Sequence, residues 1–169
     1  MEENNKCPKK TDTQCCVKFN PEKWDNKIFE WDNKIFIEES IPTFFHIPFP
    51  PMIWKKITKM WELAKEANAM PKNDEDCLVL FYDPHPFKSE LYMTVTKDVP
   101  NAQNKTISWT FQAKVFDWPY NAIPKFMKQM DEILKSENKK ALKYYIHYAY
   151  CPGCSKKYWH NYMILFAWI

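Results

Sequence analysis

Residues 51–68 have the sequence PMIWKKITKMWELAKEAN. Its apolar side chains recur at steps of three and four residues, at Ile53, Ile57, Met60, Ala64 and Ala67. Lysines and glutamates occupy the opposite positions, so the spacing predicts an amphipathic helix that opens at a proline. Runs rich in β-branched and aromatic residues predict strands around it, at 35–47, 77–82 and 89–96.

The same order of elements recurs roughly 70 residues later, which indicates an internal duplication. The second set comprises a strand at 106–116, a helix at 124–137 and strands at 143–150 and 158–168. We therefore predict an α+β fold of two β-α-β-β halves. The halves form an antiparallel-rich sheet with both helices on one face and a ligand cleft on the other.

The N-terminal part has a different character. Residues 1–23 are polar and carry three cysteines, and we interpret them as an extension of a single domain that spans 24–169. The hexapeptide WDNKIF occurs twice, at 24–29 and 31–36. This repeat is interpreted as a local duplication or as a hairpin of two strands joined through Asp32-Asn33.

Composition excludes several classes of function. A single glycine among 169 residues rules out glycine-rich phosphate-binding loops, and no organic cofactor is predicted. The net charge of +3 comes without an arginine cluster, so nucleic acid is not an expected partner. No apolar run approaches the roughly 20 residues of a membrane span, and we expect a cytoplasmic protein without membrane contact.

Alternation along residues 89–96 assigns the two faces of one strand. Leu91, Met93 and Val95 are predicted to face the helix, which leaves Glu90 and Tyr92 on the other side. One helix in each half cannot cover both faces of the sheet. Because aromatic residues make up 17% of the chain, we expect rings to line a ligand cleft on the second face.

Several short motifs carry a resemblance to a known family. AKVFDWPY at 113–120 is followed by the second predicted helix, FYDP at 81–84 precedes ELY at 90–92, and NYMI at 161–164 lies in the last strand. With the order of elements, these motifs resemble the GyrI-like small-molecule-binding family over about residues 35–168. The resemblance implies SHS2-like halves in a stand-alone member of the family.

The resemblance also implies a function, with two departures. Trp118 replaces the glycine of the family's Gly-Pro-Tyr turn, and the place of a carboxylate that pairs with cationic ligands falls on His160 or Asn161. Glu90 is the replacement carboxylate that we consider. One subfamily uses an aromatic cage to hydrolyse the strained cyclopropane of DNA-alkylating compounds, so the chain resembles a candidate cyclopropyl hydrolase.

In that reading Glu90 is the general base, and burial among rings would raise its pKa. Tyr92 or Tyr148 would donate a hydrogen bond to the oxygen that gains charge. The expected ligand is a hydrophobic, planar xenobiotic or metabolite. The residues expected to contact it share an aromatic character and a place on or beside the predicted strands: Phe45, His46, Trp109, Phe111, Tyr145, Tyr148 and Tyr162.

Two other functions stay open. A flat aromatic patch would favour a protein-interaction module like the gyrase inhibitors of the family. Cys151-Pro152-Gly153-Cys154, placed between two predicted strands, has the spacing of half a zinc site, and Cys15-Cys16 or His160 could complete it. The leading hypothesis involves no metal.

Overall fold

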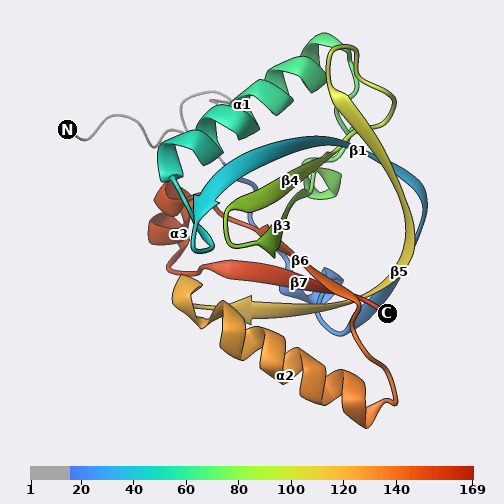
Figure 1. Cartoon of the computed structure of the whole chain (residues 1–169), viewed down its shortest axis with the longest axis vertical. Helices are drawn as coiled ribbons and strands as arrows, with labels where there is room; N and C mark the ends of the chain where they lie inside the picture. Colours follow the sequence, from blue (N-terminus) through green and yellow to red (C-terminus); the bar gives the residue numbers. More distant parts are fainter. Residues whose placement is uncertain (1–15) are drawn as a thin grey trace. The chain divides into compact units, whose positions relative to one another are not determined.

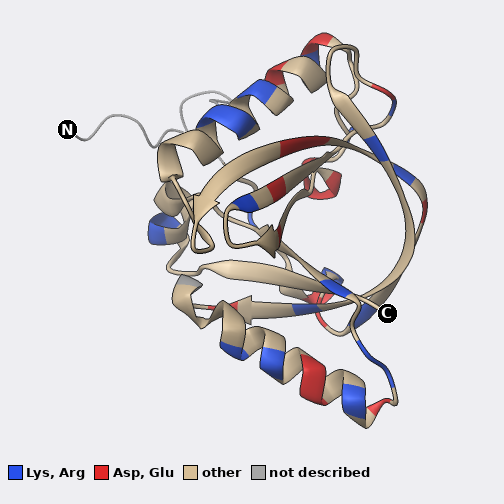
Figure 2. Cartoon of the chain, in the orientation of Figure 1, with Lys and Arg blue, Asp and Glu red and all other residues tan. Residues whose placement is uncertain are grey.

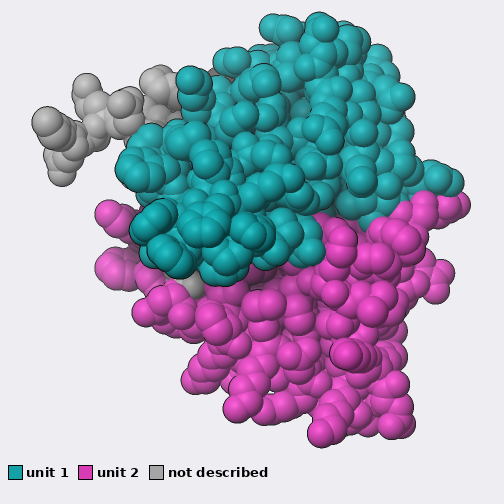
Figure 3. All heavy atoms as spheres, in the orientation of Figure 1, with its two compact units in different colours: residues 1–8, 33–107 teal, residues 9–32, 108–169 magenta. Residues whose placement is uncertain are grey.

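The computed structural model describes residues 16–169, which divide into two compact units. Unit 1 contains residues 33–107, and unit 2 contains the described residues up to 32 together with 108–169 (Figure 3). Figure 1 labels the helices and strands of both units. No helix in this part of the chain combines the length and apolar character needed to cross a bilayer.

Unit 1 contains one helix and antiparallel strands. Its elements are β1 (Lys27–Phe44, from Asn33 onward), β2 (Ile47–Pro48), α1 (Pro50–Glu66), the 3-10 turn η2 (Asp74–Asp76), β3 (Val79–His85) and β4 (Lys88–Thr94). The strands lie in the order β2-β1-β4-β3. Register pairs Glu38 with Tyr92 between β1 and β4, and Tyr82 with Glu90 between β3 and β4.

Unit 2 repeats this arrangement. Its elements are η1 (Pro21–Lys23), β5 (Gln103–Asp117, from Ser108 onward), η3 (Tyr120–Ala122), α2 (Ile123–Ser136), β6 (Lys143–Tyr148), α3 (Pro152–Tyr158) and β7 (Tyr162–Trp168). The strands lie in the order β5-β7-β6, antiparallel throughout. In both units the strand before the helix pairs with the last strand of the half, and the last strand pairs with the strand that follows the helix. This pairing confirms the predicted duplicated β-α-β-β organisation of an α+β fold.

Each helix covers one face of its own strands. In unit 1 the buried Met60 and Ala64 of α1 pack against Leu91 and Met93 of β4, as alternation predicts. In unit 2, the buried residues Phe126, Met130 and Leu134 of α2 pack against Met163 and Leu165 of β7. Figure 2 shows charges of both signs interspersed along α1 and α2, as expected for the solvated sides of amphipathic helices.

The predicted hairpin in the WDNKIF repeat is wrong. β1 runs without a reversal from Lys27 to Phe44, and Asp32-Asn33 lies inside it. Asn26 and Asn33 occupy the same place in the two hexapeptides, and both have a positive φ, of 55° and 49°. Asparagine tolerates this conformation as a single residue, so the repeat marks two local irregularities of the backbone instead of a turn.

The predicted strand at 158–168 is also too long. Residues 152–158 form α3, with Pro152 in its first turn and the Cys151 sulfur accepting a hydrogen bond from the backbone N–H of Cys154. Trp159 has a positive φ of 58° and ends the helix, after which β7 begins at Tyr162. The Cys-Pro-Gly-Cys sequence therefore opens a helix and does not lie in a simple strand connection.

Candidate ligand-binding and catalytic site

Two carboxylates and two phenols share the face of the unit 1 sheet opposite α1. They are Glu38 of β1, Tyr82 of β3, and Glu90 and Tyr92 of β4. Glu38 pairs with Tyr92 and Tyr82 with Glu90 in the strand register, and residues directly opposite one another point to the same side. The intervening residues Leu91 and Met93 belong to the core under α1.

Glu90 is held by hydrogen bonds at both of its oxygens. The Tyr92 hydroxyl donates to Oε2 at 2.6 Å, and the Lys88 ammonium donates to Oε1 at 3.0 Å. The Glu90 side chain is 15% exposed, whereas that of Lys88 is 49% exposed. Because the Tyr92 hydrogen is directed at Glu90, Tyr92 orients the carboxylate here and would have to reorient to donate to a ligand.

Glu38 is a site residue that the sequence argument missed. Burial, and then the neighbouring charge of Glu90, raise the pKa of the Glu38 carboxyl, while Lys105 and Lys88 oppose the shift. Burial and the charges of Glu90 and Asp83 likewise raise the pKa of Tyr82. The face therefore disfavours further negative charge. The sequence signal that could have identified Glu38 was strand alternation, which places Phe36, Glu38 and Ser40 on one face of β1.

An exposed aromatic cluster lies at the turn end of the same strands. We define it as Phe44, Phe45 and Phe87. The centroid of the Phe45 ring lies 4.7 Å from the centroid of the Phe44 ring and 5.5 Å from that of the Phe87 ring. Phe44 and Phe45 are 69% and 62% exposed. Phe87 lies three residues before Glu90, so roughly 10 Å of extended strand separates the cluster from the carboxylates.

Phe45, a member of this cluster, and His46 form the turn between β1 and β2, and both are predicted ligand contacts. Their φ angles are positive, at 49° and 67°. Nδ1 of His46 lies 2.6 Å from Oδ2 of Asp83, which fixes the imidazole. A two-residue turn with positive φ at both positions favours Asn-Gly, so Phe45 and His46 each carry backbone strain of about 1 kcal/mol. Backbone strain of this kind is concentrated at functional sites.

Phe111 and Tyr145, predicted as cage residues, lie in a buried ring cluster of unit 2. The Phe111 centroid lies 4.4 Å from Trp31 and 5.9 Å from Tyr145. Trp31, from the second WDNKIF hexapeptide, also contacts Phe166 at 5.5 Å. The face of these strands opposite α2 is thus packed with rings from the chain itself, which accounts for part of the aromatic excess.

The other predicted rings of unit 2 lie apart from that cluster. Trp109 is 44% exposed and contacts Trp168 at a centroid distance of 4.1 Å. Tyr162 stacks on His160 at 4.7 Å. Tyr148 packs in the α2 core, on the opposite side of the strands from Phe111. The structure therefore does not bring the predicted rings of this unit into one group.

Asp117 supplies a carboxylate beside His160 and Asn161, the two positions where the resemblance predicted one. Its oxygens lie 2.7 Å from Nδ1 of His160 and accept a 2.7 Å hydrogen bond from the backbone N–H of Asn161. The side-chain amide of Asn161 is buried, and neither its nitrogen nor its oxygen has a hydrogen-bond partner within residues 16–169. His160 is thus engaged with Asp117, and the position offers a carboxylate paired with an imidazole in place of an isolated carboxylate.

Three thiols of unit 2 form the one cluster in the described chain with enough ligands for a metal ion: Cys16, Cys151 and Cys154. Cys15, also a predicted ligand, lies outside the described residues. A hydrogen bond with Cys16, opposed by burial, lowers the pKa of the Cys151 thiol to about 5. Burial raises the pKa of the Cys154 thiol. The pKa of the Cys16 thiol is raised by its hydrogen bond with Cys151 and by burial.

Solved structures share the fold. The C-terminal domain of EcmrR has a TM-score of 0.59 at 12% identity, over 86% of this chain and 96% of that one. EcmrR in a complex with DNA scores 0.60 at 12% identity, over 83% of this chain and 55% of that one. SAV2435 bound to tetraphenylphosphonium scores 0.50 at 10% identity, over 85% and 93% of the two chains.

These likenesses show that the chain has the same fold as the EcmrR C-terminal domain and SAV2435. The chain itself belongs to the family described as "Bacterial hydrolase", whose sequence profile matches residues 7–169. No curated protein matched the sequence.

Proposed function

We propose that the protein binds a hydrophobic small molecule, a xenobiotic or metabolite, that carries a cationic or electrophilic centre. The observation that carries this proposal is the pair Glu38 and Glu90 on one sheet face, beside the exposed cluster of Phe44, Phe45 and Phe87 in the same unit. The rings would hold the apolar body of the ligand. The carboxylates would select its charge.

The electrostatics favour a cation over a neutral ligand. The charges of Glu38 and Glu90 oppose one another, so a cation between them relieves repulsion that the unliganded protein contains. Lys88 already offsets part of this repulsion through its ion pair with Glu90. Because Lys88 is exposed, a cationic ligand can displace it from Glu90 at a small cost in free energy. A cation over an aromatic face adds about 0.5–2 kcal/mol. Tetraphenylphosphonium, bound by the distant structural relative SAV2435, is a ligand of this chemical type.

Two ions of the same shape and opposite charge test the proposal: tetraphenylphosphonium and tetraphenylborate. Isothermal titration of the wild-type chain with each should give at least about tenfold tighter binding of the cation, equivalent to 1.4 kcal/mol. Equal affinities would mean that the rings act without the carboxylates. Tighter binding of the anion would contradict the proposal. Nucleic acid is not among the partners that we propose.

Hydrolysis of a strained electrophile is the second candidate, and the family description favours it. Water would attack a cyclopropane carbon while its proton passes to Glu90. The ring carbon–carbon bond would break, and its electron pair would move to a conjugated oxygen of the ligand. A positioned general base contributes about 3–5 kcal/mol to such a step. The held geometry of Glu90 and Tyr92 supports Glu90 in this role.

Turnover of a cyclopropane-bearing alkylating compound tests hydrolysis separately from binding. The wild type should consume the compound, and Glu90→Gln should lower kcat by about 100-fold or more. Glu132→Gln, an equivalent change on the exposed side of α2, is the matched control. A wild type that binds the compound without consuming it is a binder alone, and a Glu90→Gln variant as fast as the wild type excludes the general-base role.

A protein-interaction module is the rival function. The exposed cluster, with Ile47 and Phe49 also about 70% and 69% exposed, would suit an apolar patch on a partner. Such an interface does not need paired carboxylates behind it. The comparison of the two ions therefore separates the rival from the leading proposal.

A further inference from the structure

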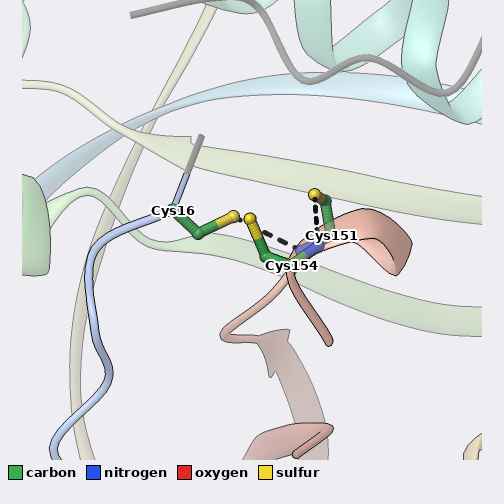
Figure 4. A group of neighbouring side chains, drawn as sticks. All are labelled: Cys16, Cys151 and Cys154. Atoms are coloured by element: carbon green, nitrogen blue, oxygen red, sulfur yellow. Dashed lines mark hydrogen bonds between the residues drawn. The ribbon is translucent and has the colours of Figure 1, made fainter. Parts of the chain in front are cut away.

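Three cysteine side chains of unit 2 point toward one another (Figure 4). Cys16 precedes the first 3-10 turn, whereas Cys151 caps α3 and Cys154 lies in its first turn. Their sulfur atoms all lie within 4.8 Å of one another. Cys151 and Cys154 are buried, and Cys16 is partly buried.

We propose that Cys16, Cys151 and Cys154 form a thiolate site for a soft d10 cation, Zn²⁺ or Cu⁺. This site is independent of the small-molecule function proposed for unit 1. Thiolate sulfur is the ligand that both cations favour in proteins. The role of the ion would be structural, because it would join two segments that are 135 residues apart in the chain.

The spacing of the sulfur atoms fits such an ion. Zinc–sulfur bonds of about 2.3 Å in a tetrahedral site separate the sulfur atoms by roughly 3.8 Å. Since no pair here exceeds 4.8 Å, an ion would draw the sulfurs together by at most about 1 Å. Cys151 and Cys154 also have the Cys-x-x-Cys spacing common in zinc sites, and Cys16 adds a third ligand from a distant segment.

Backbone donors already face the sulfur atoms. The N–H of Cys151 donates to Cys16 Sγ at 3.5 Å, and the N–H of Cys154 donates to Cys151 Sγ at 3.4 Å. Hydrogen bonds of this kind offset negative charge on thiolate ligands and orient them. A Cβ at Gly153 would lie 3.9 Å from Cys151 Sγ, so the turn between the two cysteines is close but not crowded.

The segment that carries Cys16 is held against α3 by other contacts. The Tyr158 hydroxyl donates to the Cys16 carbonyl oxygen at 3.4 Å, and the Phe19 N–H donates to the Tyr150 hydroxyl at 2.9 Å. Phe19 also contacts the Tyr162 ring at 5.3 Å. These contacts position the third thiol before any ion binds. A disulfide would use two of the three sulfurs and leave the convergence of the third without a role.

The test is metal analysis of the full chain, purified under reducing conditions and supplied with Zn²⁺ or Cu⁺ in separate arms. One equivalent per chain should remain after gel filtration in at least one arm, and the arms identify the ion. Cys16→Ser, Cys151→Ser and Cys154→Ser should each weaken binding by at least about tenfold. Cys77→Ser, in unit 1, is the matched control and should bind as the wild type does.

A second readout does not depend on the variants folding. Co²⁺ added to the wild type should give the intense visible bands of cobalt in tetrahedral thiolate coordination, and Zn²⁺ should abolish them. Bound metal should also protect the three thiols from alkylation, as peptide mapping would show. Less than a tenth of an equivalent of either ion, a disulfide among these cysteines in the reduced preparation, or equal binding by all variants would overturn the proposal.

Discussion

The Tyr92 hydroxyl donates a 2.6 Å hydrogen bond to Oε2 of Glu90, two residues earlier on the same strand. Because side chains alternate along a strand, residues two apart share a face, and this bond fixes the Glu90 carboxylate on the side away from α1. The other oxygen of Glu90 is bound by Lys88.

Tyr92→Phe should lower the free energy of unfolding by about 1–2 kcal/mol, since it removes a hydrogen bond to a partly buried carboxylate. A double-mutant cycle with Glu90→Gln, measured by urea denaturation, should give a coupling energy of about 1 kcal/mol. A coupling near zero would mean that the hydrogen bond does not form in solution.

Lys88→Met should strengthen binding of tetraphenylphosphonium by roughly two- to fivefold, because the ligand no longer competes with the ammonium for Glu90. Lys128→Met removes the same charge from an exposed position on α2 and should leave the affinity unchanged. Equal effects of both variants would point to long-range charge, and weaker binding by Lys88→Met would contradict the competition.

Glu38 and Glu39 are neighbours on opposite faces of β1, and we expect opposite pH dependence from them. Burial and the charge of Glu90 raise the pKa of Glu38, so its favourable contribution is present below the unfolded value of 4.5 and is lost as the pH rises through the folded pKa. Glu38→Gln should therefore stabilise the protein at neutral pH relative to the wild type. That advantage should disappear on acidification, as urea denaturation across pH would show.

Glu39 has the contrasting environment. Burial alone would raise its pKa, but hydrogen bonds from Lys56 and Lys59 of α1, at 2.7 and 2.6 Å, outweigh burial and lower the pKa. Its contribution is present above 4.5 and is lost as the pH falls through the folded pKa. Glu39→Gln should cost about 0.5–1 kcal/mol at neutral pH and less in acid. The same sign for both variants would contradict the assignment of faces.

Leu91→Ala should destabilise the protein by about 2–5 kcal/mol, because Leu91 is fully buried under α1. Leu142→Ala, at a side chain that is 65% exposed, should change the free energy of unfolding by less than about 0.5 kcal/mol. Thermal or urea unfolding of both variants tests the assignment of the buried face of β4. Similar small losses in both would place Leu91 outside the core.

The parts of the fold that follow from local spacing could be predicted from sequence. The periodicity of residues 51–68 gives α1, and alternation along 89–96 assigns Leu91 to the helix side and Glu90 to the other. Recurrence of the pattern gives the second half. Each of these inferences depends on residues within one element.

The errors arise where a local signal was short or ambiguous. The repeated WDNKIF gave no hydrophobic pattern that separates one long strand from a hairpin, and α3 has only seven residues, too few for a helical period. The start of α3 was nevertheless signalled by Pro152, because proline is favoured in the first turn of a helix.

The site depends on contacts between distant segments, which spacing along the chain does not encode. Glu38 joins Glu90 only through the register of β1 and β4. Trp31 covers Phe111 only because the start of β1 packs in unit 2. Cys16 lies close to Cys154 in space although most of the chain separates them in sequence.

We propose that the paired carboxylates Glu38 and Glu90 give unit 1 a preference for a cation. The most direct test is the ratio of the Kd values for tetraphenylborate and tetraphenylphosphonium, measured by titration for the wild type and for the double variant Glu38→Gln/Glu90→Gln. The ratio should be at least about 10 for the wild type and fall close to 1 in the double variant, with Glu132→Gln retaining the wild-type ratio. A double variant that keeps the wild-type ratio would show that Glu38 and Glu90 do not select the charge of the ligand.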